Sequence, residues 1–419
     1  MAPARVEKII TGIDVGSSKV TALIAGQTAD GALIVLGSGV REAQGVKQGC
    51  VTDIAAVDRS VREALEQAER VAGIEVQDVW IGFGGPNVTT RTLPHEEECG
   101  GGQIDEGDVA DLLARARERA INPRLSVLHA LPALYTIDGN AGVRDPVGMF
   151  ADRLGVEIYL VETDRGPISN LATAVRAAHV NIRDVASNAM AAGLAVLSAE
   201  ARDLGVAVVD MGASLTNIGL FAGNMLVGLA TLPIGGSVLT DDIATEFNTR
   251  RSQAERIKCF YGSALSSPRD HQDQIEIEGP EGMAADPAQR AKITRAQLNA
   301  VIRRRLDDMM PQINQALKRM GYGEGAPRQI VLTGGCAELK GLAEYAQTVL
   351  GGSVRIGRPQ GLSGLPDAHA GPASAVAVGL ITHAVSDTAD LRSMIASARP
   401  ESMPQRWWQR LMAIWQQNA

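Results

Sequence analysis

Two stretches of the chain, about two hundred residues apart, share the same order of apolar and polar positions. Residues 13–26 read IDVGSSKVTALIAG, and residues 209–223 read VDMGASLTNIGLFAG. In each stretch an apolar run reaches an acidic residue, turns at a glycine followed by small residues, and resumes as a second apolar run. Short apolar runs around a glycine turn are typical of β-hairpins. The pattern therefore predicts two hairpins, one opening each half of the chain.

The residues at both predicted turns are of the kind that hold phosphate. They are Asp14, Gly16, Ser17, Ser18 and Lys19 in the first turn, and Asp210, Gly212, Ala213 and Ser214 in the second. Glycine allows close backbone approach, successive N–H groups can bind an anion, and a carboxylate at a strand end can hold a hydrated divalent cation. The repeat predicts a duplicated α/β fold whose two hairpins clamp one polyphosphate. Two ordinary surface hairpins are the alternative, and Lys19 facing solvent is an open possibility.

Residues 329–342, QIVLTGGCAELKGL, form a third glycine-centred segment. The apolar run predicts a strand, Gly334 and Gly335 predict a turn, and the residues after them, including Glu338 and Lys340, predict a helix. Glycines at such a turn let a flat base lie against the backbone near a helix N-terminus. We expect this turn to belong to the same ligand site as the two hairpins.

Two shorter features are expected beside that ligand. Gly235 and Gly236 predict the start of a helix next to the phosphates. Glu255 and Lys258 stand three residues apart on a predicted helix, so both side chains can face one ligand, and they suit ribose hydroxyls. An ion pair on the helix surface explains the same spacing without a ligand.

Residues 403–417 carry apolar side chains at helical spacing. The predicted apolar face comprises Trp407, Trp408, Leu411, Met412, Ile414 and Trp415. Arg406 and Arg410 lie mainly opposite, and no acidic residue follows Glu401. A helix of about 15 residues is too short to span a bilayer but can lie in its surface, and its cationic, indole-rich character predicts binding to an anionic membrane. Docking on a partner protein or on the chain's own body is the alternative. The polar residues 386–402 predict a flexible linker.

Composition narrows the class of protein. The chain has 419 residues, 45% of them hydrophobic and 21% charged, which suffices for two or more cores and excludes a disordered or fibrous protein. Cys50, Cys99, Cys259 and Cys336 lack metal-ligand spacing and stand far apart, which argues against a cysteine metal centre and a disulfide framework.

Charge and hydropathy exclude two further classes. The formal net charge is −8 and the chain has no tract rich in Lys and Arg, which argues against nucleic acid as a partner. The first residues lack the apolar segment of a signal peptide, and no apolar stretch of about 18 residues predicts a membrane-spanning helix. We therefore expect a soluble body.

The two hairpins, a helical segment that begins at Asn188, and the TGG turn occur in an order that resembles the ATP-binding superfamily of actin, DnaK-type chaperones and sugar kinases. Within that superfamily, residues 129–161, HALPALYTIDGNAGVRDPVGMFADRLGVEIYLV, are similar to a segment of the FtsA family of bacterial cell-division proteins. The segment GGSVLTDDIA and the tryptophan-rich basic tail resemble the same family. The resemblance runs from about residue 8 to 385 and resumes at the tail.

The resemblance implies a two-lobed, actin-like (ribonuclease H-like) α/β ATPase fold with an inserted subdomain and a C-terminal amphipathic helix. The expected boundaries are 1–85, 163–205 and 360–385 for the core of the first lobe; 86–162 for the insert; 206–240 and 306–359 for the core of the second lobe; 241–305 for its small subdomain; 386–402 for the linker; and 403–417 for the membrane helix.

The family further implies a role as an adaptor rather than a metabolic enzyme. It implies binding of ATP with Mg²⁺, the metal held through water by Asp14 and Asp210, and self-association into filaments. It also implies attachment of the filament protein FtsZ to the cytoplasmic face of the inner membrane at the division septum, and recruitment of later division proteins. At most a weak ATPase activity is expected, and no residue stands out as its catalytic group.

The family's site for the C-terminal peptide of FtsZ uses an Arg and an acidic residue three apart on a helix of the small subdomain. Arg305 and Asp308 have that spacing, with Asp308 where the family usually has Glu. A solvated basic helix face is the alternative reading, above all for Arg303 and Arg304. The alternative functions are a small-molecule kinase of the same superfamily and a type IV pilus assembly adaptor. A chaperone function is not expected, because the residues after 385 are too few for a peptide-binding domain.

Overall fold

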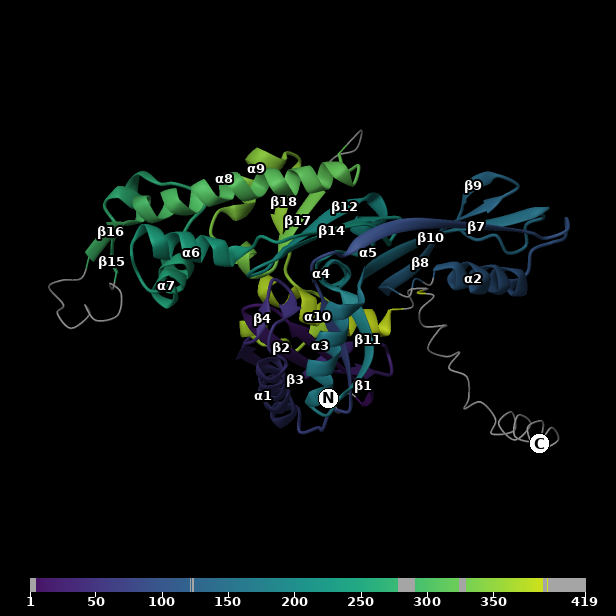
Figure 1. The fold of residues 1–419 in the computed structure, drawn as a ribbon, viewed down its shortest axis with the longest axis horizontal. Coiled ribbons are helices and arrows are strands. Elements are labelled where there is room, and N and C mark those ends of the chain that lie inside the picture. The colour runs from purple at the N-terminus through teal and green to yellow at the C-terminus, as the bar shows by residue number, and fades with distance from the viewer. Residues whose placement is uncertain are drawn as a thin grey trace, which may run out of the picture. The chain divides into compact units, whose positions relative to one another are not determined.

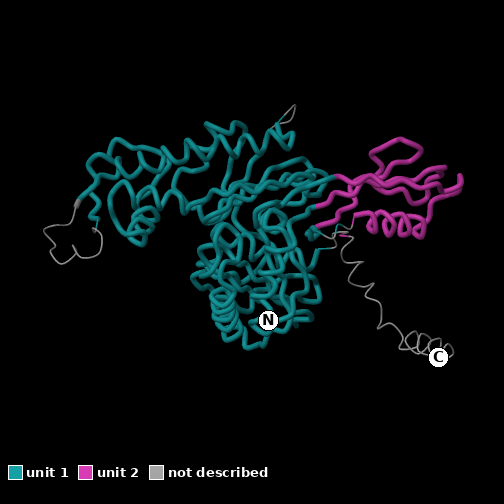
Figure 2. The backbone as a smooth tube through the Cα atoms, viewed as in Figure 1, with its two compact units in different colours: residues 1–91, 122–128, 161–388 teal, residues 92–121, 129–160, 389–419 magenta. Residues whose placement is uncertain are grey.

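The computed structural model describes residues 5–120, 122, 124–277, 291–323, 329–386 and 390. The chain forms two compact units (Figure 2). Unit 1 comprises residues 1–91, 122–128 and 161–388, and unit 2 comprises residues 92–121, 129–160 and 389–419. The predicted membrane helix, residues 403–417, lies outside the described residues, as does the predicted linker apart from residues 386 and 390.

The first sheet of unit 1 contains the first predicted hairpin (Figure 1). Its strand order is β11-β6-β1-β2-β3-β19. The strands are β1 (Val6–Val15), β2 (Lys19–Thr28), β3 (Leu33–Glu42), β6 (Asp78–Phe83), β11 (Asn181–Ser187) and β19 (Leu362–Ser363). The pairs β1/β2 and β2/β3 are antiparallel, and β6 continues the sheet parallel to β1. The short strands β4 (Val46–Lys47) and β5 (Cys50–Val51) pair with each other.

The second sheet of unit 1 repeats this arrangement. Its order is β14-β13-β12-β17-β18, with β12 (Val206–Met211), β13 (Thr216–Ala222), β14 (Met225–Leu232), β17 (Gln329–Thr333) and β18 (Ser353–Ile356). Strands β12, β13 and β14 are antiparallel, and β17 lies parallel to β12. In both sheets, therefore, the hairpin has an antiparallel strand on one side and a parallel strand on the other. Both predicted hairpins and the duplicated sheet are confirmed.

Helices of small residues lie between the two sheets. Helix α4 (Asn188–Val196) contacts β12, β13 and β17, and α10 (Ala375–Val385) contacts β1, β2 and β6. The two helices cross so closely that a Cβ at Gly379 would lie 1.7 Å from the Ala191 carbonyl oxygen. The outer helices of the first lobe are α1 (Ile54–Ala72) and α3 (Arg165–Ala177), and α5 (Ala199–Leu204) precedes β12.

The helices of the second lobe surround one apolar core. They are α6 (Gly236–Glu246), α7 (Arg251–Tyr261), α8 (Arg295–Arg319) and α9 (Leu342–Leu350), and β15 (Gln274–Ile277) pairs with β16 (Ala291–Thr294). Four short 3₁₀ turns are described, η1 (Pro268–His271), η3 (Gly335–Glu338), η4 (Asp367–His369) and η5 (Pro372–Ser374). Buried Ile, Leu and Met side chains of α8 form much of the core. Helix α8 runs without interruption through the boundary predicted between residues 305 and 306.

A third sheet has the order β7-β10-β8-β9. Its strands are β7 (Thr89–Glu98), β8 (Leu125–Ile137), β9 (Asn140–Val143) and β10 (Arg153–Asp164), and its helix is α2 (Glu106–Ala120). The helix buries Leu112, Leu113 and Ala116. Within the described part of the chain, no helix combines the length and the apolar character needed to cross a membrane.

Gly379→Ala should destabilise the protein strongly, because the added methyl group has no space against the Ala191 carbonyl oxygen. Overpacking a core costs about 1–3 kcal/mol, and we expect the free energy of unfolding, measured by urea denaturation, to fall by at least that amount. Gly166→Ala near the start of α3 is the control, because a Cβ there meets no atom within 4 Å and alanine favours a helix. Equal denaturation midpoints for both variants would contradict the close crossing.

Candidate functional site

The two hairpin turns have the same backbone geometry. The Gly16 N–H donates to the Lys19 carbonyl oxygen at 3.0 Å, and the Gly212 N–H donates to the Leu215 carbonyl oxygen at 2.9 Å. A Cβ at Gly16 would lie 2.9 Å from the Lys19 carbonyl oxygen, so a larger residue would open this turn. The glycines close both hairpins tightly, and the small residues that follow stand at the tips.

The tips of the two hairpins touch. The Ser214 hydroxyl donates to the Ser17 hydroxyl at 2.5 Å, across 197 positions of the sequence. Ser18 is exposed beside them, and Ala213 is partly exposed. The structure thus brings together the two turns that the sequence repeat singles out.

Asp14 and Asp210 are held with unusually high pKa values. Burial raises the pKa of Asp14 to about 6, although the nearby charge of Lys19 lowers it. Burial raises the pKa of Asp210 to about 7; the hydrogen bond from Asn217 opposes this rise, and the charge of Asp14 adds to it. Two carboxylates that repel each other in a poorly solvated place would be stabilised by a shared cation.

Asn217 and Thr231 position Asp210, and the sequence pattern does not reveal them. Asn217 lies opposite Asp210 in the ladder of β12 and β13. The Asn217 Nδ2 donates to Asp210 Oδ2 at 3.2 Å, and the Thr231 hydroxyl donates to Asn217 Oδ1 at 3.2 Å. Strand register would have been the signal for Asn217, because residues that pair across a ladder share one face.

Two buried oxygen atoms near the hairpins lack a hydrogen-bond partner in the described part of the chain. They are the Thr21 hydroxyl, which pairs with Asp14 in the β1/β2 ladder, and Asn188 Oδ1 at the start of α4. A Cβ at Gly84 would lie 2.7 Å from Asn188 Nδ2 and 2.9 Å from the amide of Asn217, so the two amide side chains converge on this glycine. Buried polar atoms of this kind ordinarily bind water or a ligand.

The turn after β17 packs directly on Asp210. Gly334 has a φ of 85°, and a Cβ there would lie 2.5 Å from Asp210 Oδ1. Gly335 is exposed at the same turn. The predicted helix after it is absent at Glu338 and Lys340: Glu338 ends the 3₁₀ turn η3, and Lys340 precedes α9. The two glycines force a tight turn, so the α-helix begins only at Leu342.

Helix α6 begins at the second hairpin, as predicted, but its first amides are already occupied. The Gly236 N–H donates to the Gly212 carbonyl oxygen at 2.9 Å, and the Ser237 N–H donates to that of Ala213 at 2.7 Å. A Cβ at Gly235 would lie 2.6 Å from both carbonyl oxygens. These glycines therefore fasten α6 to the turn, and the N–H groups of Gly236 and Ser237 are not available to a phosphate.

Glu255 and Lys258 form an ion pair that is tied to α6. Lys258 Nζ lies 2.7 Å from Glu255 Oε2 and donates to the Thr240 hydroxyl at 2.8 Å and to the Gly236 carbonyl oxygen at 3.1 Å. The Lys258 side chain is 13% exposed, whereas that of Glu255 is 51% exposed. Lys258 therefore has a structural role between α6 and α7, and Glu255 is the member of the pair that faces solvent.

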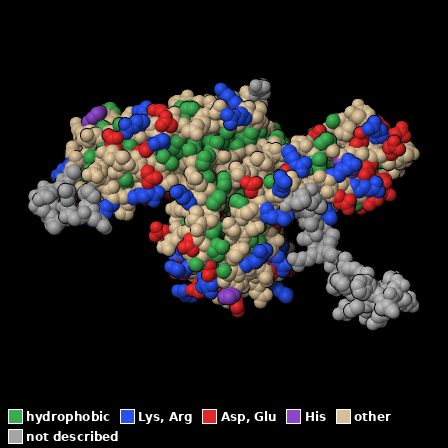
Figure 3. Space-filling model, in the orientation of Figure 1, with side chains coloured by type: hydrophobic (Ala, Val, Ile, Leu, Met, Phe, Trp, Pro, Cys, Tyr) green, Lys and Arg blue, Asp and Glu red, His purple; other side chains and the backbone are tan. Residues whose placement is uncertain are grey.

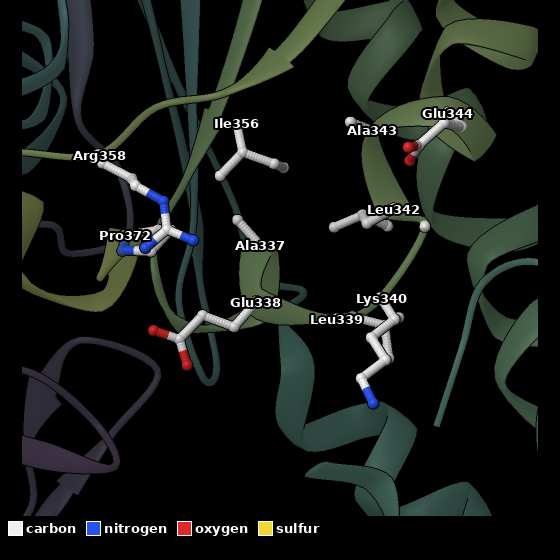
Figure 4. Close-up of a pocket in the computed structure, with 11 residues that line it drawn as sticks. Ala337, Glu338, Leu339, Lys340, Leu342, Ala343, Glu344, Ile356, Arg358 and Pro372 are labelled. Carbon is white, nitrogen blue, oxygen red and sulfur yellow. The ribbon is translucent and has the colours of Figure 1, made fainter. Parts of the chain in front are cut away.

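A pocket of about 430 Å³ lies beside η3 (Figure 4). Its lining comprises residues 337–344 together with Ile356, Arg358 and Pro372. Glu338 and Lys340 of the predicted base-binding segment line this pocket, whereas Gly334 and Gly335 do not. Figure 4 shows the Glu338 carboxylate and the Arg358 guanidinium on the same side of the pocket, and the sequence analysis does not single out Arg358.

Arg305 and Asp308 line a second pocket, of about 270 Å³. The other lining residues are Asp242, Thr245, Glu246 and Arg304. Arg305 Nε and Nη2 donate to the Asp242 carboxylate at 2.5 and 2.7 Å, and Asp308 lies 3.7 Å from Arg305 Nη1. Asp242 and Glu246 are the residues that sequence reasoning misses here, because they approach α8 from α6.

Asp210→Asn should change how stability depends on pH in the absence of nucleotide and divalent cations. A carboxyl with a raised pKa keeps its proton in the folded chain while the unfolded chain releases it, so native stability falls as pH rises from about 4 to about 7. Because the pKa of Asp210 is about 7, the stability of the native chain should fall over this pH range by roughly 2–4 kcal/mol more than that of Asp210→Asn.

The measurement is the free energy of unfolding by urea at several pH values from about 4 to about 8. Asp111→Asn, at an exposed aspartate of α2, should leave the native pH profile unchanged. Profiles of Asp210→Asn and the native chain that remain parallel would show that Asp210 ionises normally.

Comparisons with known proteins agree with the sequence resemblance. The family profile described as "Cell division protein FtsA" matches residues 207–379, and the profile "SHS2 domain inserted in FTSA" matches residues 87–162. The cell division protein FtsA of Rhizobium meliloti (strain 1021) is 33% identical over 406 residues, which cover 94% of this chain and 91% of that protein.

Two solved structures share the fold. The "PilM-PilN type IV pilus biogenesis complex" has a TM-score of 0.62 and 18% identity, covering 90% of this chain and 98% of the other. MreB 5 of Spiroplasma citri bound to AMPPNP has a TM-score of 0.51 and 13% identity, covering 94% and 98%. At this identity they show the fold alone, and it is the actin-like ATPase fold that the resemblance implies. The curated relative and the two family profiles decide the rest: the chain belongs to the FtsA family of cell division proteins.

Proposed function

We propose that this chain is a nucleotide-dependent adaptor that binds ATP with Mg²⁺, self-assembles into filaments and attaches FtsZ to the cytoplasmic face of the inner membrane at the division septum. There it would recruit later division proteins. The observation that carries the proposal is the contact between Ser17 and Ser214, which joins two duplicated hairpins beside two carboxylates, in a member of the FtsA family. The adaptor has at least three binding surfaces, for nucleotide, peptide and membrane.

The residues at the hairpins fit a magnesium nucleotide. Asp14 and Asp210 would hold the metal through water, and the turns at residues 16–18 and 212–214 would hold the phosphates. The raised pKa values of both carboxyl groups and the unpartnered Thr21 hydroxyl and Asn188 Oδ1 support a polar ligand at this place. The described residues contain no group of three or more His, Cys, Asp or Glu side chains that could hold a metal ion, so phosphate oxygens and water would complete the coordination.

The other end of the nucleotide would lie along the second lobe. The exposed Gly335 would leave room for a base, while the buried Gly334 holds the same turn against Asp210. Glu338 would flank the base, and the half-exposed Glu255 would meet the ribose. The solved structure of MreB 5 contains AMPPNP, an ATP analogue, on the same fold. The turns at residues 16–18 and 212–214 would hold the phosphates of ATP from the two hairpins. Closure of the hairpins around the nucleotide would favour the filament-forming arrangement.

Mg²⁺ should strengthen nucleotide binding by the native chain, and Asp14→Asn should remove that gain. We expect a loss of about tenfold in affinity, the value of one hydrogen bond to a charged group. Isothermal titration with a non-hydrolysable ATP analogue, with and without Mg²⁺, measures it. Asp111→Asn should titrate like the native chain. A native chain that binds no nucleotide would remove this part of the proposal.

The pocket at Arg305 would hold the C-terminal peptide of FtsZ. Its lining carries three carboxylates, on Asp242, Glu246 and Asp308, and two guanidinium groups, on Arg304 and Arg305. Such a pocket suits a peptide that carries both signs of charge, because each charged group can find an opposite partner. The pairing of Arg305 with Asp242 holds the guanidinium in place before the peptide arrives.

Arg305→Glu should weaken peptide binding at least tenfold, since it places a third carboxylate beside Asp242 and Asp308. Arg303→Glu is the matched control on the same helix, because the Arg303 side chain donates to Ser266 and does not line the pocket. Titration calorimetry with the FtsZ peptide gives both affinities, and urea denaturation checks that each variant folds. Equal affinities for the two variants would place the peptide elsewhere.

The predicted helix 403–417 would form the membrane-binding surface of the protein. One short helix anchors weakly, as a single lipid chain does. Filament formation adds a further helix with each subunit, and after the first insertion the others are effectively intramolecular. Membrane attachment and self-assembly would therefore strengthen each other.

A further inference from the structure

Charge is distributed very unevenly along the chain. Residues 92–121 and 129–160 of unit 2 contain twelve Asp and Glu but five Arg and no Lys, although the whole chain has a net charge of only −8. Figure 3 shows acidic side chains on the outer part of this unit. Residues 391–419 contain four Arg and one Glu. An acidic domain and a cationic tail on one chain attract each other.

Asp390, the last described residue of the chain, connects the tail to unit 2. Asp390 is buried, and its carboxylate accepts a hydrogen bond from the Ala130 N–H at 3.2 Å. The second carboxylate oxygen lies 3.2 Å from Nδ1 of His129, which is fully buried on β8. A carboxylate held by a buried imidazole and a backbone amide is fixed in place. The chain after residue 390 therefore starts from the insert.

Unit 2 also exposes an apolar tip, formed by Val147, Met149 and Phe150. Their exposed fractions are 43%, 42% and 69%. This loop is firmly held: Ile104 N–H donates to the Met149 carbonyl oxygen, and Gly148 N–H donates to that of Ile104, both at 2.8 Å. The backbone is thus ordered while the side chains remain in water, which is typical of a surface that binds a partner.

The residues next to the apolar tip are more often acidic than basic: they include four Asp, and Arg144 and Arg153. Asp105 and Asp108 stand at the start of α2, directly after Ile104, and each accepts a hydrogen bond from the other's backbone N–H, at 2.9 and 3.0 Å. Asp145 precedes the tip and Asp152 follows it. An apolar centre with mainly acidic neighbours complements the predicted helix 403–417, for which the sequence predicts tryptophans on one face and arginines opposite.

The tail is long enough to reach the tip. At the end of β8 far from His129, the Asp138 N–H donates to the carbonyl oxygen of Arg153 at 3.0 Å. Arg153 lies three residues after Phe150. The nine residues from His129 to Asp138 extend over about 30 Å. The thirteen residues from Asp390 to Met403 can span up to about 45 Å.

We propose that residues 403–417 dock on the apolar tip of their own chain when no membrane is present, with Asp390 as the anchor. This inference rests on the proposed membrane role of that helix. The docked helix shields its tryptophans from water and covers Phe150. A membrane must displace the helix from the insert before the chain can attach, so attachment is gated by the insert.

The experiment uses the full chain with Trp80→Phe, which leaves Trp407, Trp408 and Trp415 as the only indoles. Quenching of their emission by acrylamide, a neutral quencher, reports exposure without interference from charge. Without lipid, we expect weaker quenching than in a free peptide of residues 391–419. Quenching equal to that of the free peptide overturns the proposal.

Phe150→Ser should weaken docking about tenfold, since a buried phenylalanine ring is worth that much in association, and quenching should rise toward the peptide value. Phe260→Ser is the matched control, because Phe260 lies in unit 1 and is 68% exposed, against 69% for Phe150. Asp390→Ala should also raise quenching, since it frees the start of the tail. Equal effects of Phe150→Ser and Phe260→Ser overturn the proposal.

Varying the salt concentration and the protein concentration identifies what occupies the apolar tip. Salt should raise quenching, because charge attracts the tail to the tip, whereas dilution should leave quenching unchanged. Quenching that rises on dilution shows that the tail docks on a second copy, which overturns docking within one chain.

Vesicles with anionic lipid test the membrane role separately. They should bind Phe150→Ser more tightly than the parent chain, because its tail no longer has to leave the insert. Equal vesicle binding by the parent and Phe150→Ser overturns the gating by the insert. Docking without any vesicle binding overturns the membrane role and leaves the docking intact.

Discussion

The close crossing of α4 and α10 is the constraint on which the meeting of the two hairpins depends. Helix α10 packs on the strands of the first sheet and α4 on those of the second. Where they cross, Gly379 faces the carbonyl oxygen of Ala191 with no space for a side chain. Both helices consist mainly of Ala, Gly and Val, so backbone contact sets the distance between the sheets. That distance lets Ser17 reach Ser214.

The site at the hairpins is built at a cost in stability. Asp14 and Asp210 are less readily ionised than aspartates in water, because burial disfavours both charges and the charge of Asp14 further disfavours that of Asp210. Lys19 and Asn217 offset only part of this. Active and binding sites commonly keep such groups because a ligand stabilises them. The glycines nearby serve a different purpose, since they hold the turn after β17 and the start of α6 tightly against the second hairpin.

The insert gives the chain an uneven electrostatic character that the net charge hides. Residues 92–121 and 129–160 of unit 2 contain twelve Asp and Glu against five Arg, and the last residues of the chain are cationic. The insert and an anionic bilayer therefore both suit the same tail. Competition between them would make attachment to a membrane depend on what else covers the insert.

The sequence by itself determined the two hairpins, the duplicated sheet and the family. Local sequence patterns specify the hairpins: a strand, a glycine turn and a second strand occur twice, with polar residues in the same order. The helix predicted at Glu338 was wrong because Gly334, with a φ of 85° and close contacts to Asp210 and Met211, imposes a tight turn there. The spacing of Glu255 and Lys258 suits either a shared ligand or an ion pair. The structure contains the ion pair, together with a bond from Lys258 to Thr240 that the spacing does not predict.

The tertiary structure decided which groups meet. Asn217 finds Asp210 through strand register, Asp242 finds Arg305 across two helices, and Asp390 finds His129 over 261 positions of sequence. None of these pairs has a characteristic spacing, because the partners belong to different elements. A local pattern specifies a turn or a helix face. Only the packing of the whole chain decides what lies opposite that face, since packing depends on all elements together.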